Sequence, residues 1–515
     1  FTASDLSGFS SCRHKSFLAY HAALHQIDPA ADNTLQRVAL HTVQKLHTTF
    51  RLLLSERYGP VLTLPDSFAN EARSDAVRQT LDAMQSGAAV IENAVLMDMP
   101  WFAPVDFLIR LPASPTDPIR YGAAQITPGY HISHSVQWRF LLSAWLLGRV
   151  THGLPADGFI LLGNQEILPI AYKESAQRLQ WPATRRRLLK AHKASFQQNA
   201  HPVPVPACRH CEWLPQCQRI WEKEDRLILI RSISLHQTQQ LEKAGIMRRT
   251  DLASLPEQTP VEGISSDQLR ILRAQAQMEV LSKQQHRIIF HWANPPQGFT
   301  QLPVPQSADI FLDLESDPFA ASDRLDYLLG WMAREADVLT YHTLWAHDRL
   351  AERAAFDQLM QNFAAAWKRC PALHIYHYGN YERAALTRLA AQYGMHQDLL
   401  AQLKSRRVFV DLHQIIRTSL ETSLPSLSLK TIEALYEPTA RQGAVANALE
   451  SVYQYDLWKK THDPAILHNI SSYNRQDCLS LYHLQSWLEE QRKDWEILHH
   501  TFLPRPSLPD NAPDA

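Results

Sequence analysis

The sequence predicts an α/β protein with more than one domain. At 515 residues, the chain is longer than a single hydrophobic core usually supports. Segments with the pattern of buried strands, such as "RIIFHWA" and "ADIFLDLES", alternate with segments whose apolar residues recur at helical spacing, such as "SVQWRFLLSAWLLGRV". From about residue 286 to 492 this alternation is regular, which is typical of a sheet with helices on its faces.

Composition and charge exclude several classes of protein. With 45% hydrophobic and 20% charged residues, the chain has the composition of an ordinary globular protein. The formal net charge of −1 gives no overall attraction to nucleic acid, so any such binding has to come from local basic patches. The sequence has neither an apolar run of membrane-spanning length nor a basic-then-apolar signal segment, and we expect a cytoplasmic protein without membrane contact.

Four regions follow one another along the chain. Residues 1–225 have the mixed pattern of an α/β module, residues 226–285 are expected to be all-helical, and residues 286–502 are expected to form a second α/β domain. Residues 503–515, "LPRPSLPDNAPDA", are rich in proline and polar residues and are expected to be disordered.

The elements of the first region follow from periodicity. Apolar residues at helical spacing predict helices, and alternating or short apolar runs predict strands. In chain order these are a helix at 35–59, two paired strands within 89–112, a strand at 120–127, a helix at 135–150, a strand at 158–163 and a basic helix at 183–198.

The predicted basic helix carries five cationic residues: Arg185, Arg186, Arg187, Lys190 and Lys193. Such a row can bind the phosphates of a nucleic acid. It is equally typical of a solvated helix face, so both interpretations stay open.

Two glycine turns mark the helical region. "AGI" (244–246) and "EGI" (262–264) each precede residues that favour a helix N-terminus. Both are similar to helix-hairpin-helix elements, in which backbone N–H groups at a helix N-terminus contact a phosphate. Arg248 and Arg249 lie beside the first turn. A plain helical linker is the alternative.

The third region contains a pair of acids on an apolar strand. In "FLDLES", Asp313 and Glu315 are two residues apart, so the side-chain alternation of a strand points both to the same face. Two like charges on a buried strand are costly unless a cation neutralises them, and hard divalent ions such as Mg²⁺ take oxygen ligands of this kind. The alternative is structural, with one acid capping a helix and the other solvated.

Further acids follow this pair at the ends of predicted strands and on a predicted helix. Glu382 stands at a helix start in "HYGNYE", and Asp411 follows an apolar strand in "VFVDLH". Tyr473 and Asp477 in "YNRQD" are four residues apart, which places them on one face of a helix.

This ordered set resembles the DEDD-type exonucleases of the RNase H-like fold. The resemblance assigns Asp313 and Glu315 to the first motif, Glu382 to the second, where Asp is usual, and Tyr473 and Asp477 to the third. It implies that the four carboxylates hold two Mg²⁺ or Mn²⁺ ions and that the tyrosine orients or deprotonates the attacking water. The acid of "VFVDLH" is expected to have a supporting role.

Three of the six cysteines lie within ten residues, in "CRHCEWLPQC", as Cys208, Cys211 and Cys217. Clustered cysteines in a reducing compartment indicate a metal site rather than disulfides. A lone Cys12 followed much later by this C-x₂-C-x₅-C pattern resembles the iron–sulfur RecB-like nucleases, among them AddB. The resemblance implies a [4Fe–4S] cluster that ties together the two ends of a PD-(D/E)XK nuclease module.

Zinc is the alternative occupant of the cysteine cluster. His14 and His210 are close enough in the sequence to act as ligands, although zinc sites favour paired knuckles of two ligands each. Cys370 and Cys478 are predicted to be core residues.

The same resemblance predicts a degenerate nuclease site in the first region. His41, Asp106 and Gln137 match residues of the family pattern. Where the family has an acid-x-Lys strand, this chain has Gln125 and Thr127. Without that acid and that lysine, one metal ligand and the group that positions the water are lost, so the module is expected to be inactive and to bind nucleic acid or act as a scaffold.

Over nearly its full length the chain resembles a bacterial family of RecB-like nucleases that joins an iron–sulfur PD-(D/E)XK module, a helical linker and a YprB-type RNase H-like exonuclease domain. This implies a metal-dependent 3′–5′ exonuclease on single-stranded nucleic acid, with DNA favoured over RNA. The chain has no GxxxxGK[ST] phosphate loop, so a helicase would be a separate partner. A non-catalytic nucleic-acid-binding subunit of a helicase or defence complex is the alternative.

Overall fold

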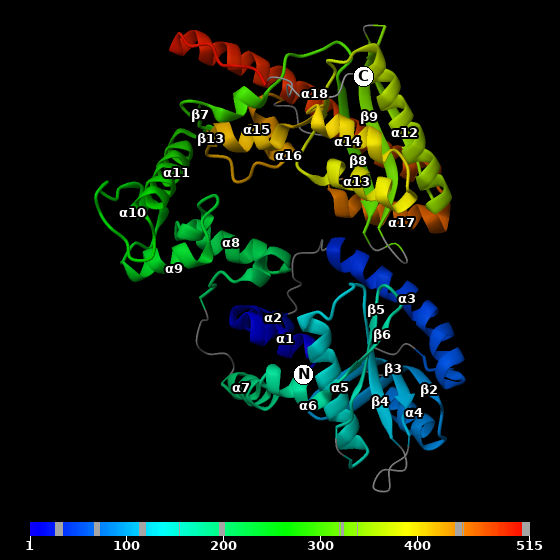
Figure 1. Cartoon of the computed structure of the whole chain (residues 1–515). Helices are drawn as coiled ribbons and strands as arrows, with labels where there is room; N and C mark the ends of the chain where they lie inside the picture. Colours follow the sequence, from blue (N-terminus) through cyan, green and yellow to red (C-terminus); the bar gives the residue numbers. More distant parts are fainter. Residues whose placement is uncertain are drawn as a thin grey trace. The chain divides into compact units, whose positions relative to one another are not determined.

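The computed structural model describes residues 1–25, 34–65, 73–112, 120–153, 155–194, 201–318, 320, 324–336, 338–437, 445 and 447–506, without the side chains of 23–25, 34–42 and 209–210. The chain divides into two compact units, the first made of Phe1–Arg219 and the second beginning at Ile220 (Figure 1). The predicted boundary at 225/226 lies a short way into the second unit, and the predicted domain division stays a prediction. No described helix combines the length and the apolar character needed to cross a membrane.

A six-stranded sheet forms the centre of the first unit. Its strands lie in chain order, so each strand pairs with the next one in the sequence. The pairs β1–β2 and β4–β5 are parallel, and the other pairs are antiparallel. The strands are β1 (Val61–Thr63), β2 (Val90–Asp98), β3 (Trp101–Arg110), β4 (Tyr121–Thr127), β5 (Gly158–Leu162) and β6 (Ile167–Ile170).

Helices cover both faces of this sheet. The helix α5 (His134–Val150) packs on one face, against alternate strand residues such as Ile91 and Leu108. The helix α3 (Thr34–Tyr58) packs on the other face, against the intervening residues such as Val90. Burial on both faces explains why these strands have nearly continuous apolar sequences. The unit also contains α1 (Ala3–Ser11), α2 (Arg13–His25), α4 (Arg73–Gln85), α6 (Tyr172–Arg178) and α7 (Trp181–Lys193).

The second unit begins with a helical segment. Gly245 and Gly263 adopt positive φ angles of 83° and 79°, a conformation that favours glycine, and the turns that contain them lead into two helices. Buried leucines such as Leu227, Leu241 and Leu252 form the core of this segment. The helices are α8 (Leu214–Lys223), which crosses the boundary between the units, α9 (Leu235–Lys243), α10 (Arg249–Ala253) and α11 (Ser266–Gln285).

A five-stranded sheet forms the rest of the second unit, in the order β10-β9-β8-β11-β12. The central strand β8 is antiparallel to β9 and parallel to β11. The strands are β8 (Ile310–Asp317), β9 (Leu325–Glu335), β10 (Val338–Trp345), β11 (Ile375–His377) and β12 (Phe409–Asp411), and a separate two-stranded ribbon pairs β7 (Phe290–Trp292) with β13 (Leu420–Thr422).

Helices lie on both faces of this sheet as well (Figure 1). One face packs on α12 (Arg349–Arg369), α13 (Tyr381–Tyr393) and α14 (Gln397–Ser405). The other face packs on α15 (Leu412–Ser419) and on the long helix α18 (Pro464–His499). Two further helices are α16 (Leu429–Ile432) and α17 (Ala448–Thr461).

The helix α18 approaches the sheet closely at Gly330 of β9. Gly330 pairs with Asp313 of β8, and a Cβ atom at this glycine would overlap the side-chain oxygen of Asn474 on α18. The amide of Asn474 donates hydrogen bonds to the Asp313 carboxylate (2.7 Å) and to its backbone carbonyl (3.1 Å). The lack of a side chain at Gly330 therefore lets α18 bind the strand that carries Asp313.

We expect Gly330→Ala to lower the free energy of unfolding by about 1–3 kcal/mol, the usual cost of overpacking a closed contact. Thermal unfolding of the full chain measures this change. Gly129→Ala is the matched control, because its Cβ atom would have no neighbour closer than 3.9 Å. Equal melting temperatures for the two variants would contradict the close approach at Gly330.

Candidate active site

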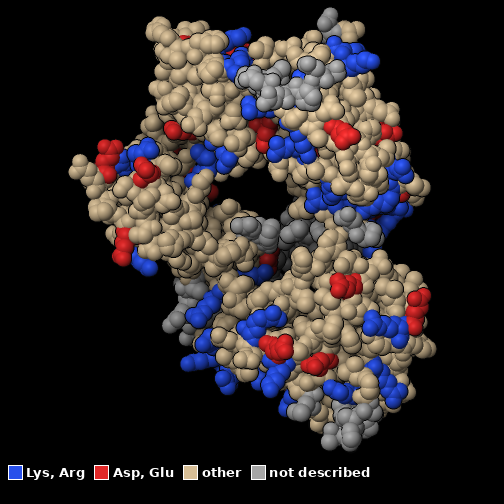
Figure 2. Space-filling model, viewed as in Figure 1, with Lys and Arg blue, Asp and Glu red and all other residues tan. Residues whose placement is uncertain are grey.

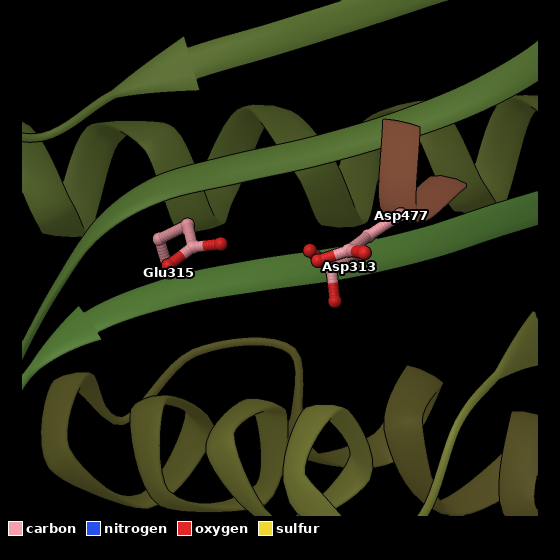
Figure 3. Close-up of side chains that lie close together, drawn as sticks. All are labelled: Asp313, Glu315 and Asp477. Atoms are coloured by element: carbon pink, nitrogen blue, oxygen red, sulfur yellow. The ribbon is translucent and has the colours of Figure 1, made fainter. Parts of the chain in front are cut away.

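Three carboxylates come together where β8 meets α18. Asp313 and Glu315 extend from β8 and Asp477 from α18, and each offers an oxygen atom that lies within 4.8 Å of the other two. Figure 3 shows the carboxylates of Asp313 and Asp477 side by side, with Glu315 farther along the same strand. Within the described ranges, this is the one group of three or more potential metal ligands with such short separations.

The local structure of β8 explains why the first two acids share a face. Leu312 and Leu314 pack in the core with α12, whereas Phe311 packs in the core with α18. The strand alternates, so Asp313 and Glu315 point to the α18 side with Phe311. One turn of α18 separates Asp477 from the Asn474 that binds Asp313.

Burial and mutual repulsion make this acidic group electrostatically unfavourable by itself. Glu315 is 5% exposed, and its burial together with the charge of Asp477 raises its pKa to about 8. A divalent cation would relieve both effects. Its positive charge replaces the hydration that the buried carboxylates lose, and it offsets the repulsion between them. The carboxylate oxygens present here are the ligand type that Mg²⁺ and Mn²⁺ prefer.

Glu382, near the start of α13, lies beside this group but outside its tight core. Its pKa is raised to about 8, mainly by burial and further by the charges of Asp411, Asp477 and Glu315. Its Oε2 atom is buried, accepts no hydrogen bond from the described residues and lies 3.7 Å from Nδ1 of His377. A buried carboxylate oxygen without a hydrogen bond fits the ligand set of a cation held by the neighbouring acids.

Asp411 has a structural task beside Glu382. It is the N-cap of α15, and one of its carboxylate oxygens accepts the backbone N–H groups of Gly379 (2.9 Å) and Gln414 (3.2 Å). These bonds fix the glycine turn that precedes α13 and hence the position of Glu382. The supporting role expected for Asp411 stays a prediction.

Tyr473 contacts a lysine, Lys430, which was not among the residues predicted for the site. Nζ of Lys430, on α16, donates a hydrogen bond to the Tyr473 hydroxyl (3.0 Å) and lies 4.3 Å from the centre of its ring. Burial, Asp477 and Glu315 raise the pKa of Tyr473 well above its usual value. The phenol is therefore neutral at physiological pH and suited to orient a water molecule rather than to deprotonate it.

The fold and the acidic group define a metal-dependent, nuclease-like domain in the second unit. Residues 310–489 match a family model of the RNase H superfamily. The C-terminal domain is thus RNase H-like, as the order of its acidic motifs predicted, and this match does not include the first unit. No curated protein matches the chain.

The first unit contains a pair of acids near one histidine, Glu92 and Asp106, and protein cations neutralise both. Glu92 accepts hydrogen bonds from Arg51 (2.6 and 2.9 Å), and Asp106 accepts two from Arg139 (2.8 and 2.7 Å). His47 lies between the acids, 3.2 Å from Glu92 and 3.5 Å from Asp106. Although burial opposes ionisation, these partners lower the pKa of Glu92 to about 2 and lower the pKa of Asp106 as well. With their charge compensated, these acids do not fit a divalent-metal site.

The β4 residues that were predicted for the degenerate nuclease site, Gln125 and Thr127, do not contribute side chains to the group around Asp106. Gln125 points into the core and donates to the Ser143 hydroxyl (2.9 Å), and Thr127 is buried. Beside the Asp106 carboxylate, β4 contributes the backbone N–H of Ile126 (2.6 Å). Gln137 is half-buried on α5.

The histidine beside Asp106 is His47, one or two helical turns beyond the predicted His41. The side chain of His41 lies outside the described residues. A second carboxylate near this histidine, that of Glu92, comes from β2 and not from the acid-x-Lys position of β4. The predicted loss of that acid and that lysine stays a prediction.

Four thiols, one from the beginning of the first unit and three from its end, lie near one another. Cys12 caps the C-terminus of α1, Cys208 lies within a short 3-10 helix at Pro206–His210, Cys211 caps that helix, and Cys217 lies on α8. Burial and the nearby Cys208, Cys211 and Cys12 raise the pKa of Cys217 to about 12. The thiols are thus near enough to act on one another.

The other residues named with these cysteines lie as follows. His14 is buried, and the side chain of His210 lies outside the described residues. Cys478 is a core residue, whereas Cys370 is half-buried.

The predicted basic residues differ in exposure. Lys and Arg side chains gather over α7 in Figure 2, where Arg186, Arg187 and Lys190 are exposed. Arg185 instead lies over the ring of Trp145, 4.2 Å from its centre. At the first glycine turn Arg248 is exposed, whereas the Arg249 side chain is 14% exposed and pairs with Asp225 (2.9 Å) and Glu279 (3.5 Å). Nucleic-acid contacts by these residues stay a prediction.

We expect His47→Gln to remove a pH-dependent part of the stability of the first unit. Hydrogen bonds with Asp106 and Glu92 outweigh the effect of burial and raise the pKa of His47 from 6.5 to about 9. The stabilisation is therefore complete below about pH 6.5 and is lost as the pH rises through about 9.

Melting temperatures measured at several pH values test this expectation. The difference between the native protein and His47→Gln should be largest near pH 6 and should shrink by about pH 9.5. His131→Gln, at an exposed histidine of the same unit, serves as control. A difference that does not vary with pH would show that His47 is not protonated in the folded protein.

Proposed function

We propose that the protein is a 3′–5′ exonuclease of the DEDD type that hydrolyses single-stranded nucleic acid, with DNA favoured over RNA. The observation that carries this proposal is the buried group of Asp313, Glu315 and Asp477 within the RNase H-like domain. Glu382 and Tyr473 beside this group complete the five residues that the resemblance assigns to such a site.

The acids and the tyrosine divide the work of phosphodiester hydrolysis. Two Mg²⁺ or Mn²⁺ ions held by the four carboxylates would stabilise the attacking water and the leaving 3′-oxygen. Tyr473, as a neutral phenol fixed by Lys430, orients that water through its hydroxyl. Asn474 holds the Asp313 carboxylate in place through its amide.

We propose a binding role for the first unit. The pairing of Glu92 and Asp106 with Arg51, Arg139 and His47 supports a RecB-like module that no longer binds a catalytic metal. The exposed cations of α7 can bind phosphates in this role. If the second unit also lacked activity, the chain would be a nucleic-acid-binding subunit that acts with a separate helicase.

The decisive experiment is hydrolysis of 5′-labelled single-stranded DNA and RNA in Mg²⁺ and in Mn²⁺. We expect Asp313→Asn and Asp477→Asn to lower the rate by at least about 100-fold, since each removes part of a metal site worth several kcal/mol. Gln125→Ala, in the first unit, should retain hydrolysis. Full activity of Asp313→Asn would refute the assignment, and binding without cleavage by the native protein in Mn²⁺ would favour the subunit role.

We further propose that Cys12, Cys208, Cys211 and Cys217 bind a [4Fe–4S] cluster. Four thiols of suitable softness gather from the two ends of the first unit. The backbone N–H of Val205 donates to the sulfur of Cys208 (3.3 Å), a contact that favours a thiolate. The cluster would tie α1 to α8, and so it would contribute to stability and binding rather than to hydrolysis.

Protein purified without oxygen should contain about four irons and four sulfides per chain. We expect Cys12→Ser to lose this iron and to lower the melting temperature, whereas Cys370→Ser, at the end of α12, should change neither. One zinc per chain in place of iron would overturn the iron–sulfur assignment and leave the site as a zinc centre.

A further inference from the structure

A cleft of about 770 Å³ lies along the outer edge of the five-stranded sheet in the second unit. The edge strand β12, the start of α13, the end of α14 and residues 504–506 line it. We call it the β12 cleft. Figure 2 shows Lys and Arg side chains on this part of the unit, over α13 and α14. The cationic residues that line the cleft are Arg383, Lys404, Arg406, Arg407 and Arg505.

The acidic groups near the cleft do not compensate these cations. Asp411 lines the cleft, but one of its oxygens is already bound to the backbone N–H groups of Gly379 and Gln414. Glu489 binds Arg505 through two hydrogen bonds, which accounts for that one arginine. The positive charge of the cleft therefore exceeds its negative charge.

Three of the cations have no carboxylate partner among the described residues. Arg383 donates to the side-chain oxygen of Asn380 (3.0 Å), and Lys404 donates to the hydroxyl of Thr387 (2.6 Å). Arg407 is exposed at the end of the row that begins with Lys404. Burial and the charge of Arg383 lower the pKa of Lys404, so like charges are held together here at an energetic cost that an anion would relieve.

The cleft begins next to the candidate active site. Arg383 follows Glu382 directly on α13, and Asp411, which lines the cleft, acts electrostatically on Glu382. The further cations that line the cleft lie at the end of α14 and directly after it. A polyanion that reached the acidic group could thus extend along the cleft.

We propose that the β12 cleft binds phosphodiester groups of the substrate strand outside the nucleotide that is hydrolysed. Arg383, Lys404 and Arg407 are the residues that would contact these phosphates. This inference rests on the proposed nuclease function, because it concerns the same strand. Guanidinium groups recognise phosphate oxygens through paired N–H donors, and an ammonium group adds a compact point charge. An open cleft lined by such groups suits a chain of phosphates better than a single enclosed anion.

The test compares Lys404→Gln/Arg407→Gln with the native protein on two substrates. One substrate is a dinucleotide, whose single phosphodiester is the one that is hydrolysed, and the other is a single strand of about 20 nucleotides. We expect the native protein to have a lower KM for the long strand and the double variant to lose this preference by at least about tenfold. Lys368→Gln/Lys460→Gln is the matched control, since both lysines are exposed on α12 and α17 of the same unit.

A binding measurement separates failure of this inference from failure of the nuclease assignment. Fluorescence anisotropy of the labelled long strand in EDTA requires no hydrolysis. We expect the double variant to bind at least about tenfold more weakly, with a salt dependence that falls by about 0.7 for each lost phosphate contact. If the native protein binds in this way but cleaves nothing, the cleft stands and the nuclease function fails.

Four results would overturn the proposal. One is unchanged affinity of the double variant for the long strand, and another is an equal loss for the dinucleotide. The third is an equal loss in the control variant, which would show a nonspecific effect of charge. Competition by inorganic phosphate or by an acidic peptide as effective as the long strand, per unit of charge, would also overturn it. The variant should melt no lower than the native protein, because Lys404 is held next to Arg383.

Discussion

Burial of several carboxylates against one another is the constraint on which the second unit depends. Asp313, Glu315 and Asp477 approach within 4.8 Å, and Glu315 is nearly inaccessible to solvent. Like charges in such a place either take up protons or bind a cation. The fold keeps these carboxylates close together, because Asn474 binds Asp313 and Gly330 lets α18 approach the sheet closely. The site is thus held in a form that a metal ion completes.

The first unit meets the same constraint with protein cations. Glu92 and Asp106 are also buried acids, but Arg51, Arg139 and His47 bind them directly. Their pKa values fall below normal, while burial and the neighbouring acids raise the pKa of Glu315. The two groups of acids thus differ in the charges that surround them. The first group is paired with protein cations, whereas the second is a cluster of carboxylates of the ligand type that divalent metals prefer.

The periodicity of the sequence predicted much of the acidic site, but it could not predict contacts between residues that are far apart in the sequence. The alternation of "FLDLES" and the four-residue spacing of Tyr473 and Asp477 depend on local geometry alone, and the family match to residues 310–489 agrees with the predicted RNase H-like domain. Lys430 reaches Tyr473 across 43 positions of sequence, and no period marks such a contact. His47 was missed for the same reason: on a long helix, only the sheet beneath decides which histidine meets Asp106.

The charges of the active site and of the β12 cleft have consequences for each other. A phosphodiester strand drawn into the cleft by Arg383 and Lys404 would place its next phosphate near the acidic group, where the negative charge of the carboxylates would disfavour it. A metal ion held by those carboxylates would offset this repulsion by its positive charge, and it would also attract the phosphate of a bound strand. By thermodynamic reciprocity each therefore strengthens binding of the other. Without the metal ion, the site would disfavour the strand, and with the metal ion it would favour it. A strand end would therefore bind tightly only to the form of the protein that can hydrolyse it.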